Sequence, residues 1–287
     1  MKTRIMVVAV AMALTPMVAF AGTHSHINPI TAANSEIGIG FLQQQSNYSE
    51  DVPSPADVEN GSMHGFTVFA KDNFGLMGIQ NLYASVKYTR ISGSTTYQEG
   101  AIATEPAGHV TNTVNVKLGK TLFLNTRNAV TPYVFGGYNN WYRTVPGAVA
   151  NPENYTNGYV GVGAKYQFAP TRHLVLAASG GIGEVIGANI DATLSNYYSE
   201  IGFDTPSQLN MGLGNRPYYT LGLSADYRVQ QHLHLIADVG YQDYMYGASS
   251  VHSFAGSGPT AGYTLNLNEP SSQTSNFAVG LSVAYGF

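Results

Sequence analysis

Cysteine is absent from the 287 residues, and charged side chains make up only 10% of them, against roughly 25% in ordinary soluble domains. Without cysteine, a disulfide framework, a thiolate metal site and a cysteine nucleophile are excluded. After residue 21 no run reaches about 18 consecutive apolar residues, which excludes a transmembrane helix there. The balance of 13 Lys+Arg against 17 Asp+Glu argues against nucleic acid as a partner.

The first 21 residues have the pattern of a secretory signal. Lys2 and Arg4 precede a short apolar stretch, and Ala19-Phe20-Ala21 matches a small-x-small cleavage site. We therefore expect residues 1–21 to be removed and Gly22 to begin the mature chain. Residues 22–287 contain no linker or low-complexity tract that would indicate a second domain, so they are expected to form one domain.

Apolar residues recur at every second position through the mature chain, as in strands with one apolar face. Near the C-terminus this large apolar set alternates with small residues; it comprises Phe277, Val279, Leu281, Val283, Tyr285 and Phe287. Comparable sets recur along the chain and give about ten segments. The segment at 173–188 is expected to be bulged, because its glycines disturb the alternation.

Three features favour a membrane barrel over a water-soluble sandwich. The small residues lie on the face that would line a narrow lumen. Aromatic residues stand at strand ends, as membrane interfaces require; they are Tyr88, Tyr166, Phe168, Tyr227, Tyr285 and Phe287. Long connections also alternate with short ones. The sequence predicts an all-β, transmembrane, antiparallel up-and-down barrel of ten strands, or of eight if two weak segments are loops.

The connections give this barrel a direction. The long ones are expected at 47–61, 92–109, 144–157, 189–217 and 247–274, and the short ones at 71–78, 119–130, 169–172 and 229–231. Five long loops outside and four short turns inside place both termini in the periplasm of a bacterial outer-membrane protein.

Two stretches resemble known families. The terminal run SNFAVGLSVAYGF, with Tyr285 and Phe287, looks like the C-terminal assembly signal of bacterial outer-membrane proteins. The stretch VKLGKTLFLNTRNAVTPYVFGGYNNWYR resembles the strand–turn–strand unit of the opacity-type surface-antigen family of small, porin-like outer-membrane barrels. The resemblance implies adhesion, envelope integrity or passage of small solutes, and no shared catalytic residues.

Seven charged residues fall on inner faces by parity. They are Glu36, Lys87, Lys117, Lys165, Asp226, Arg228 and Asp238. Unpaired charges in a narrow lumen are costly, so we expect salt-bridged pairs that plug the barrel. A narrow conducting pore for small solutes is the alternative.

The long loops that are expected to lie outside the cell are strongly acidic. They hold Glu50, Asp51, Asp57, Glu59, Glu99, Glu105, Glu153, Asp191, Glu200, Asp204 and Glu269, opposed only by Arg216. A solvated, repulsive surface is one interpretation, and recognition of a cationic or metal-bridged partner outside the cell is the other. Outer-membrane lipid is the remaining expected partner.

Catalysis is not expected. No Asp-x-His element occurs, and the remaining hydrolase candidates are Asp243 and His252 with Ser249, Ser250 or Ser253 at the outer rim. An outer-membrane hydrolase is the least favoured reading, after surface interaction and passage.

No cofactor is expected, apart from one possible metal site. If Gly22 begins the mature chain, its amine, two backbone amides and His24 in Gly22-Thr23-His24 can form a square-planar site. That geometry selects Cu(II) or Ni(II).

Overall fold

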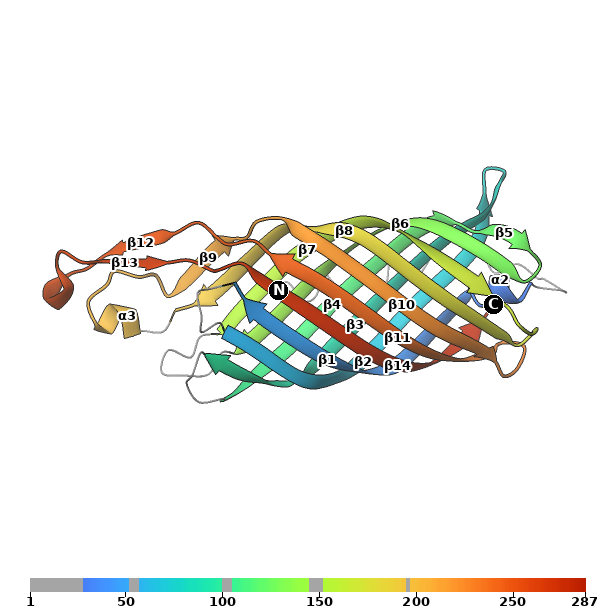
Figure 1. Cartoon of the computed structure of the whole chain (residues 1–287), viewed down its shortest axis with the longest axis horizontal. Helices are drawn as coiled ribbons and strands as arrows, with labels where there is room; N and C mark the ends of the chain where they lie inside the picture. The colour runs from blue at the N-terminus through green and yellow to red at the C-terminus, as the bar shows by residue number, and fades with distance from the viewer. Residues whose placement is uncertain (1–27, 52–56, 100–104, 145–151, 195–196) are drawn as a thin grey trace.

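The computed structural model describes residues 28–51, 57–99, 105–144, 152–194 and 197–287, and it is dominated by one long barrel (Figure 1). Ten antiparallel strands form the barrel, as the sequence predicts, and the eight-stranded alternative is excluded. They are β1 (Glu36–Glu50), β2 (Asp57–Leu76), β3 (Ile79–Glu99), β4 (Glu105–Lys120), β6 (Asn128–Thr144), β7 (Pro152–Phe168), β8 (Leu174–Thr193), β10 (Arg216–Arg228), β11 (Leu233–Tyr246) and β14 (Ser272–Gly286). Each strand pairs with the next along the chain, and β14 returns to pair with β1.

The two ends of the barrel differ. One end, which we call the turn end, holds the C-terminus and the short connections (Figure 1). Met77 and Gly78 have positive φ angles in the tight β2–β3 turn, and the short strand β5 (Leu122–Asn125) pairs with β6. The other end, which we call the loop end, holds the remaining five connections, and those between β8 and β10 and between β11 and β14 are by far the longest in the barrel. Among the described residues, no helix is long and apolar enough to cross a membrane.

The strands are longer than the alternation predicts. The predicted turns at 71–78 and 119–130 were wrong in part, because Lys71 lies within β2 and residues 122–125 form β5. The predicted loops also shrink, since β3 spans 21 residues and β8 spans 20. Beyond the apolar belt the outer face of β3 is polar, and β8 turns buried apolar residues such as Val185 and Ile190 inward, so the pattern of apolar residues facing outward ends there. The predicted bulge in β8 is confirmed at Gly187, which has φ +57°.

An apolar belt encircles the outer surface. On β10 it runs from Tyr219 to Tyr227, nine residues, which suits the ~9–11 residues of a tilted membrane strand. Leu221 and Leu223 in its middle are each 61% exposed. About half of each long strand therefore extends beyond this belt, toward the loop end.

The inner face is shaped by glycines beside aromatic rings. A Cβ on Gly163 would stand 2.7 Å from the ring of Tyr133, so only glycine fits there. Between the two ends lies a lumen cavity of about 400 Å³, lined by Lys71, Lys87, Lys117, Lys165, Asp226, Asp238 and many Ser, Thr and Asn side chains.

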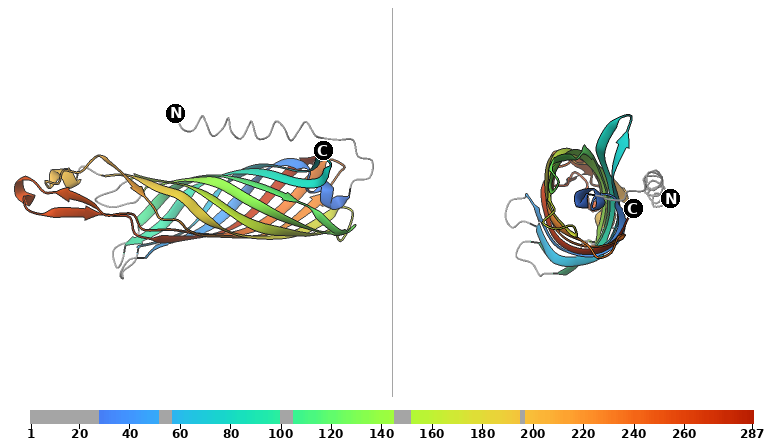
Figure 2. Two further views of the ribbon diagram at one scale, coloured as in Figure 1. Left: turned by 90° about the horizontal axis from the view of Figure 1, so that it is seen from above. Right: turned by 90° about the vertical axis from the view of Figure 1, so that its right-hand side faces the viewer.

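A short helix fills the turn end of the barrel. Helix α2 (Pro29–Ala32) is capped by the Asn28 side chain and lies inside the ring of strands (Figure 2). Ile30 is fully buried, in a cluster with Ala33, Ala129, Ala169 and Val175. Asn34 then exchanges hydrogen bonds with Gln167 and accepts one from Lys165 at 2.8 Å. The segment before β1 therefore plugs this end.

A projecting lobe extends from the loop end (Figure 1). It comprises α3 (Tyr197–Glu200), β9 (Gln208–Gly212), β12 (His252–Ala255), the 3₁₀ helix η1 (Gly258–Thr260) and β13 (Thr264–Leu267). β9 continues the barrel by pairing with β8, whereas β12 and β13 form a separate hairpin. A bridge between Phe203 and Gly256 joins the two parts.

Candidate functional site

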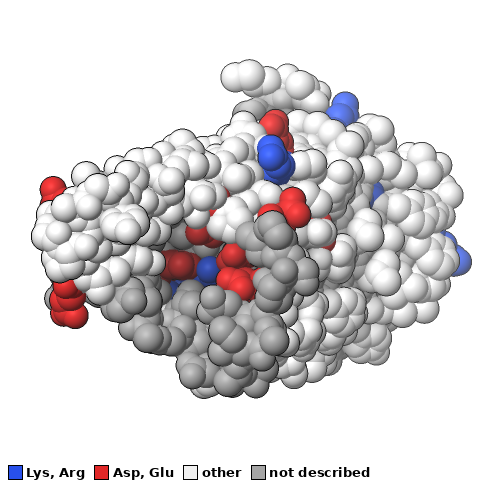
Figure 3. Space-filling model, turned by 60° about the vertical axis from the view of Figure 1, so that its left-hand side comes forward, with Lys and Arg blue, Asp and Glu red and all other residues white. Residues whose placement is uncertain are grey.

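A group of charged side chains, the mouth cluster, lies inside the barrel near the loop end. It comprises Arg143, His109, Glu50, Glu59, Glu153 and Glu269. Figure 3 shows acidic atoms around basic ones in a hollow at this end. The cluster lies beyond the apolar belt, so it is outside the membrane-spanning segments.

Arg143 is the centre of this cluster, with a side chain only 3% exposed. Its Nε lies 2.5 Å from Glu153 Oε2, its Nη1 lies 3.0 Å from Glu59 Oε1 and its Nη2 lies 3.5 Å from Glu50 Oε1. One guanidinium thereby joins strands β1, β2, β6 and β7. Such buried pairing holds the strands in place, because leaving a partner unpaired is costly.

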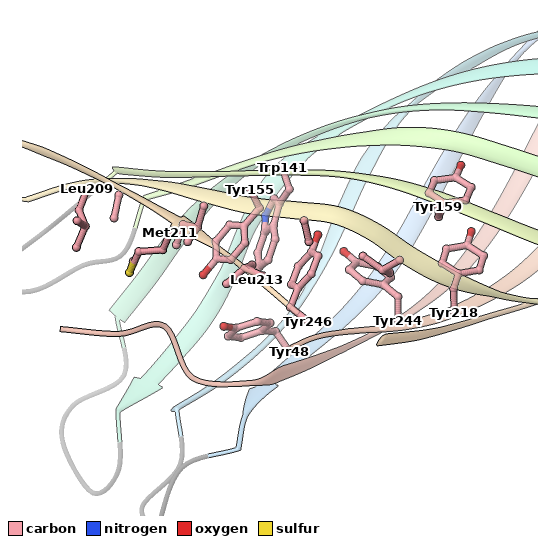
Figure 4. Close-up of a cluster of buried hydrophobic side chains, with 14 of the residues drawn as sticks. Tyr48, Trp141, Tyr155, Tyr159, Leu209, Met211, Leu213, Tyr218, Tyr244 and Tyr246 are labelled. Atoms are coloured by element: carbon pink, nitrogen blue, oxygen red, sulfur yellow. The ribbon is translucent and has the colours of Figure 1, made fainter. Parts of the chain in front are cut away.

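Aromatic rings surround the same guanidinium. Its carbon lies 4.7 Å from the ring centre of Tyr48 and 5.5 Å from those of Trp141 and Tyr155. Trp141 stacks on Tyr155, which stacks on Tyr246 (Figure 4). These side chains fill the lumen at the mouth with a packed aromatic group.

His109 is fixed by partners on both ring nitrogens. Trp141 Nε1 can only donate, and it lies 2.9 Å from His109 Nδ1, so this nitrogen must accept. His109 Nε2 therefore carries the proton, and it lies 2.8 Å from Glu59 Oε2 and 2.7 Å from Thr95 Oγ1. A neutral ring held in this way has no lone pair left for a general base.

The four carboxyl groups differ in their acidity. Burial raises the pKa of Glu269 to about 8, and the nearby Glu153 carboxylate adds to the rise. Burial also raises the pKa of Glu50, against the effect of Arg143. For Glu59 burial acts in the same direction, but the His109 hydrogen bond and the Arg143 charge outweigh it and lower the pKa.

A second cluster, the turn-end cluster, lies beside helix α2. Lys71 Nζ is 2.8 Å from Glu36 Oε1 and 3.9 Å from Asp226 Oδ2. His234 Nδ1 lies 2.7 Å from Asp226 Oδ1 and 3.3 Å from Glu36 Oε2. The ligand atoms of Glu36, Asp226 and His234 lie within 4.8 Å of one another, but the Lys71 ammonium already supplies a cation there.

The predicted lumen residues divide into separate groups. Glu36 and Asp226 belong to the turn-end cluster, whereas Lys87, Lys117, Lys165 and Asp238 line the lumen cavity. Arg228 lies at the turn end beside helix α2, where it lines a small pocket with Asp226 and His234 and its guanidinium donates to the Arg172 carbonyl. The expected pairing of Lys117 and Lys165 with Asp226 and Asp238 was wrong, because Lys71 takes that role for Asp226.

The hydrolase candidates are not brought together. Asp243 accepts hydrogen bonds from Gln273 and Ser275, and Ser253 donates to Asn266 in the β12–β13 hairpin. Within the described residues, no hydrogen bond joins Asp243 to His252. The alignment of a nucleophile, a base and an acid is therefore missing at this rim.

Sequence reasoning missed Arg143 and assigned its partners to solvent. Glu50, Glu59 and Glu153 were expected in loops, but they stand at strand ends and point inward. The signal for Arg143 was available, since inner parity runs from Tyr133 through Trp141. Arg143 was not recognised as a lumen residue because it lies one residue before the loop predicted at 144–157.

The remaining sequence predictions concern the chain ends. Residues 1–21 and the site Gly22-Thr23-His24 lie outside the described residues. Tyr285 is 57% exposed on the outer face, and the Phe287 amide donates to the Ser35 carbonyl at 3.2 Å. Their role as an assembly signal stays a prediction.

Comparison with solved structures places the fold. The chain resembles the outer membrane protease OmpT from Escherichia coli, with a TM-score of 0.58 and 10% identity over 88% of this chain and 95% of that one. It also aligns with OprG of Pseudomonas aeruginosa (TM-score 0.35, 12% identity, 88% and 98% covered). A third alignment is with Ail of Yersinia pestis (TM-score 0.34, 10% identity, 88% and 99% covered).

These likenesses show the fold alone: the chain has the architecture of bacterial outer-membrane β-barrel proteins. No protein-family model and no curated protein matches the chain. The opacity-type resemblance accordingly gains no support beyond the two stretches that suggested it.

Proposed function

We propose that this chain is an integral protein of the bacterial outer membrane whose role is surface interaction through the projecting lobe, adhesin-like and without catalysis. The observation that carries the proposal is the length of the strands relative to the belt. The 21 residues of β3 are about twice the length that a membrane needs. A wall built so far beyond the belt supports the lobe well away from the lipid surface.

The orientation of the barrel in the membrane and the charge of the lobe support the same proposal. With both termini in the periplasm, the loop end faces outward, as the short turns on the other side favour. Glu200 and Asp204 are exposed on the lobe, and Tyr263 of the same lobe is 70% exposed. Such a surface suits a cationic partner with contacts to an aromatic ring.

The test compares attachment of cells that display the protein to beads coated with polylysine or polyglutamate. Deleting residues 252–267 removes Tyr263 and the backbone partner of Asp204, so it should weaken the preference for polylysine while the barrel stays heat-modifiable on gels. The double variant Glu200→Gln, Asp204→Asn should weaken it, whereas the control Asp238→Asn, an acid of the lumen, should leave it unchanged. Unaltered attachment in both lobe variants would contradict the proposal.

A narrow pore is the second candidate, favoured by the polar lumen cavity of about 400 Å³. Against it, the acidic mouth cluster, the lysines below it and helix α2 stand in series, so ions of either sign meet a barrier. We therefore expect no steady conductance in planar bilayers. A stable, ion-selective current from the unaltered protein would favour the pore instead.

The mouth cluster supports the part of the proposal that assigns no catalytic activity to the protein. His109 has no lone pair for proton abstraction, and the Glu59 carboxylate is already engaged by Arg143, His109 and Thr95. The resemblance in fold to a protease does not supply reacting groups. Cleavage of peptide or lipid substrates that stops in a Glu59→Gln variant would overturn this part.

A further inference from the structure

Three lysines face the middle of the lumen. Lys87 on β3, Lys117 on β4 and Lys165 on β7 all line the cavity of about 400 Å³. Lys87 is exposed to this space, and the other two are half-buried. All three lie below the mouth cluster and above the plug formed by helix α2.

These lysines have neutral neighbours. The Lys117 ammonium lies 4.8 Å from the ring centre of Tyr133, and that of Lys165 lies 3.9 Å from the ring centre of Tyr83. Lys165 also donates to the side-chain oxygen of Asn34. In the part of the chain that is described, none of the three ammonium groups has a carboxylate within the 4.0 Å of an ion pair.

The three charges are also close to one another. Lys87 pairs with Asn115 and Ser85 pairs with Lys117, so the two lysines are diagonal neighbours on one face of β3 and β4. Lys165 reaches across to the ring of Tyr83 on β3, the strand that carries Lys87. Like charges beside a partly dry wall repel more strongly than in water, so the arrangement calls for a counter-anion.

The acids of the barrel do not supply that anion. Glu36 and Asp226 are engaged by Lys71 and His234 in the turn-end cluster. Asp238 stands on β11, which is separated from β3 along the wall by β14, β1 and β2. Three ammonium groups and the carboxylate of Asp238 therefore line the middle of the lumen. The Ser85 hydroxyl and the Asn115 amide line the same wall and can donate further hydrogen bonds, since Asn115 gives only one of its two N–H groups to Tyr159.

We propose that the lumen binds a small dianion of the phosphate class between Lys87, Lys117 and Lys165. Ammonium groups bind phosphate as point charges, and three of them around a polar space match two negative charges. The cavity is larger than one phosphate ion, so it also admits a small phosphorylated solute. This site is independent of the lobe and of the surface interaction proposed for it.

The test is a thermal and calorimetric titration of the full-length protein refolded in a non-ionic detergent. Inorganic phosphate and glycerol phosphate are the two probes, each compared with chloride at equal ionic strength. One saturable site per barrel, with a Tm that rises with phosphate and not with chloride, is expected. Tighter binding of glycerol phosphate would identify a phosphorylated solute as the natural ligand, and tighter inorganic phosphate would identify the free ion.

Lysine variants distinguish a site that binds phosphate from a cluster of lysines that only repel one another. Replacing Lys87 and Lys117 by Gln should weaken phosphate binding by about tenfold or more for each lysine. The same double variant should melt higher than the unaltered protein without phosphate, because repulsion is relieved, and lower than it in saturating phosphate. Lys120→Gln, an exposed lysine at the turn end, is the matched control and should bind as the unaltered protein does.

Two results would overturn the proposal. One is that the unaltered protein shows neither a heat of binding nor a rise in Tm with phosphate beyond that seen with chloride. This result does not depend on whether the variants fold. The other is undiminished binding in a folded Lys87→Gln, Lys117→Gln variant, which would place the anion elsewhere.

Discussion

Arg143 and Glu153 face each other across the β6–β7 hairpin, and Arg143 Nε lies 2.5 Å from Glu153 Oε2. Both side chains point into the barrel, where Arg143 is also shared with Glu59 and Glu50. The two strands that carry the pair are thereby joined to β1 and β2 across the mouth.

Removing this guanidinium should be costly. Arg143→Ala leaves buried carboxylates without their cation and should lower the free energy of unfolding by about 3–5 kcal/mol. Urea unfolding in detergent micelles measures the change. The control is Arg216→Ala: the side chain is exposed, its hydrogen bond among the described residues goes to the Asn215 carbonyl, and its loss should cost under about 0.5 kcal/mol. Equal stability of both variants would contradict the role assigned to the mouth cluster.

Stability should fall as pH rises through the range of Glu269. Its pKa is raised from the ordinary 4.5 to about 8, so the folded state holds a proton that the unfolded state has lost. Between these values the folded protein binds more protons, and its free energy of unfolding decreases with pH. Glu269→Gln should flatten this slope and be the more stable form above pH 8. A parallel pH profile in the variant would show that Glu269 is already ionised.

Glu59 should produce the opposite dependence in acid. Its lowered pKa stabilises the folded state above the ordinary value of 4.5, and that stability is lost as pH falls below it. Comparing Glu59→Gln with the unaltered protein between pH 3 and pH 6 isolates this effect. The difference in unfolding free energy should shrink toward the acid end; a constant difference would mean that Glu59 has an ordinary pKa.

In the turn-end cluster, Lys71→Met should strand the Glu36 and Asp226 carboxylates. If the site is dry, we expect a loss of about 3–5 kcal/mol, and less if water enters beside helix α2. Pairing Lys71→Met with Glu36→Gln should restore part of the loss. Lys120→Met, an exposed site, serves as the control for the charge change.

The outer belt gives a depth-dependent prediction. Leu223→Arg places a charge in the middle of the belt and should cost roughly 2–4 kcal/mol in lipid bilayers. Gln43→Arg also points outward but lies beyond Phe41, at the loop side of the belt, and should cost about 0–1 kcal/mol. If the two variants cost the same, the belt does not lie in the membrane.

Deleting Phe287 should slow or prevent insertion if the terminal run is an assembly signal. Within the described part of the chain, the same deletion removes one backbone hydrogen bond, to Ser35, and a half-buried side chain at the end of the barrel, so its effect on stability should be small. Insertion measured in cells, with stability measured after refolding, separates these effects. Normal insertion would leave the terminal resemblance without a functional role.

The sequence predicts the barrel well only where lipid imposes a pattern. Leu221 and Leu223 alternate with Gly222 and Ser224 because one face meets hydrocarbon and the other the lumen. Further along, β3 continues with Ser92, Ser94 and Thr96 outward, while its large side chains, Ile91 and Tyr97, turn inward, so the apolar side chains leave the outer face. These strands could not be distinguished from loops.

The mouth cluster was hidden for the same reason. Glu59 and Arg143 are 84 residues apart in sequence, and only the register of the closed barrel brings them together. Helix α2 gave no signal either, since four residues after Asn28 carry no periodicity. The alternation of strand residues correctly predicts that Lys87, Lys117 and Lys165 face the lumen. It does not predict which carboxylates lie close to them, because that depends on the register and closure of the barrel.

The position of helix α2 ties the plug to the seam of the barrel. Ile30 lies inside the ring, and the strand that follows it forms the seam with β14. The seam is a ladder of 15 residue pairs between the first strand and the last. Because β1 follows helix α2 directly, the hydrogen bonds that close the barrel also fix the point at which the leading segment enters it.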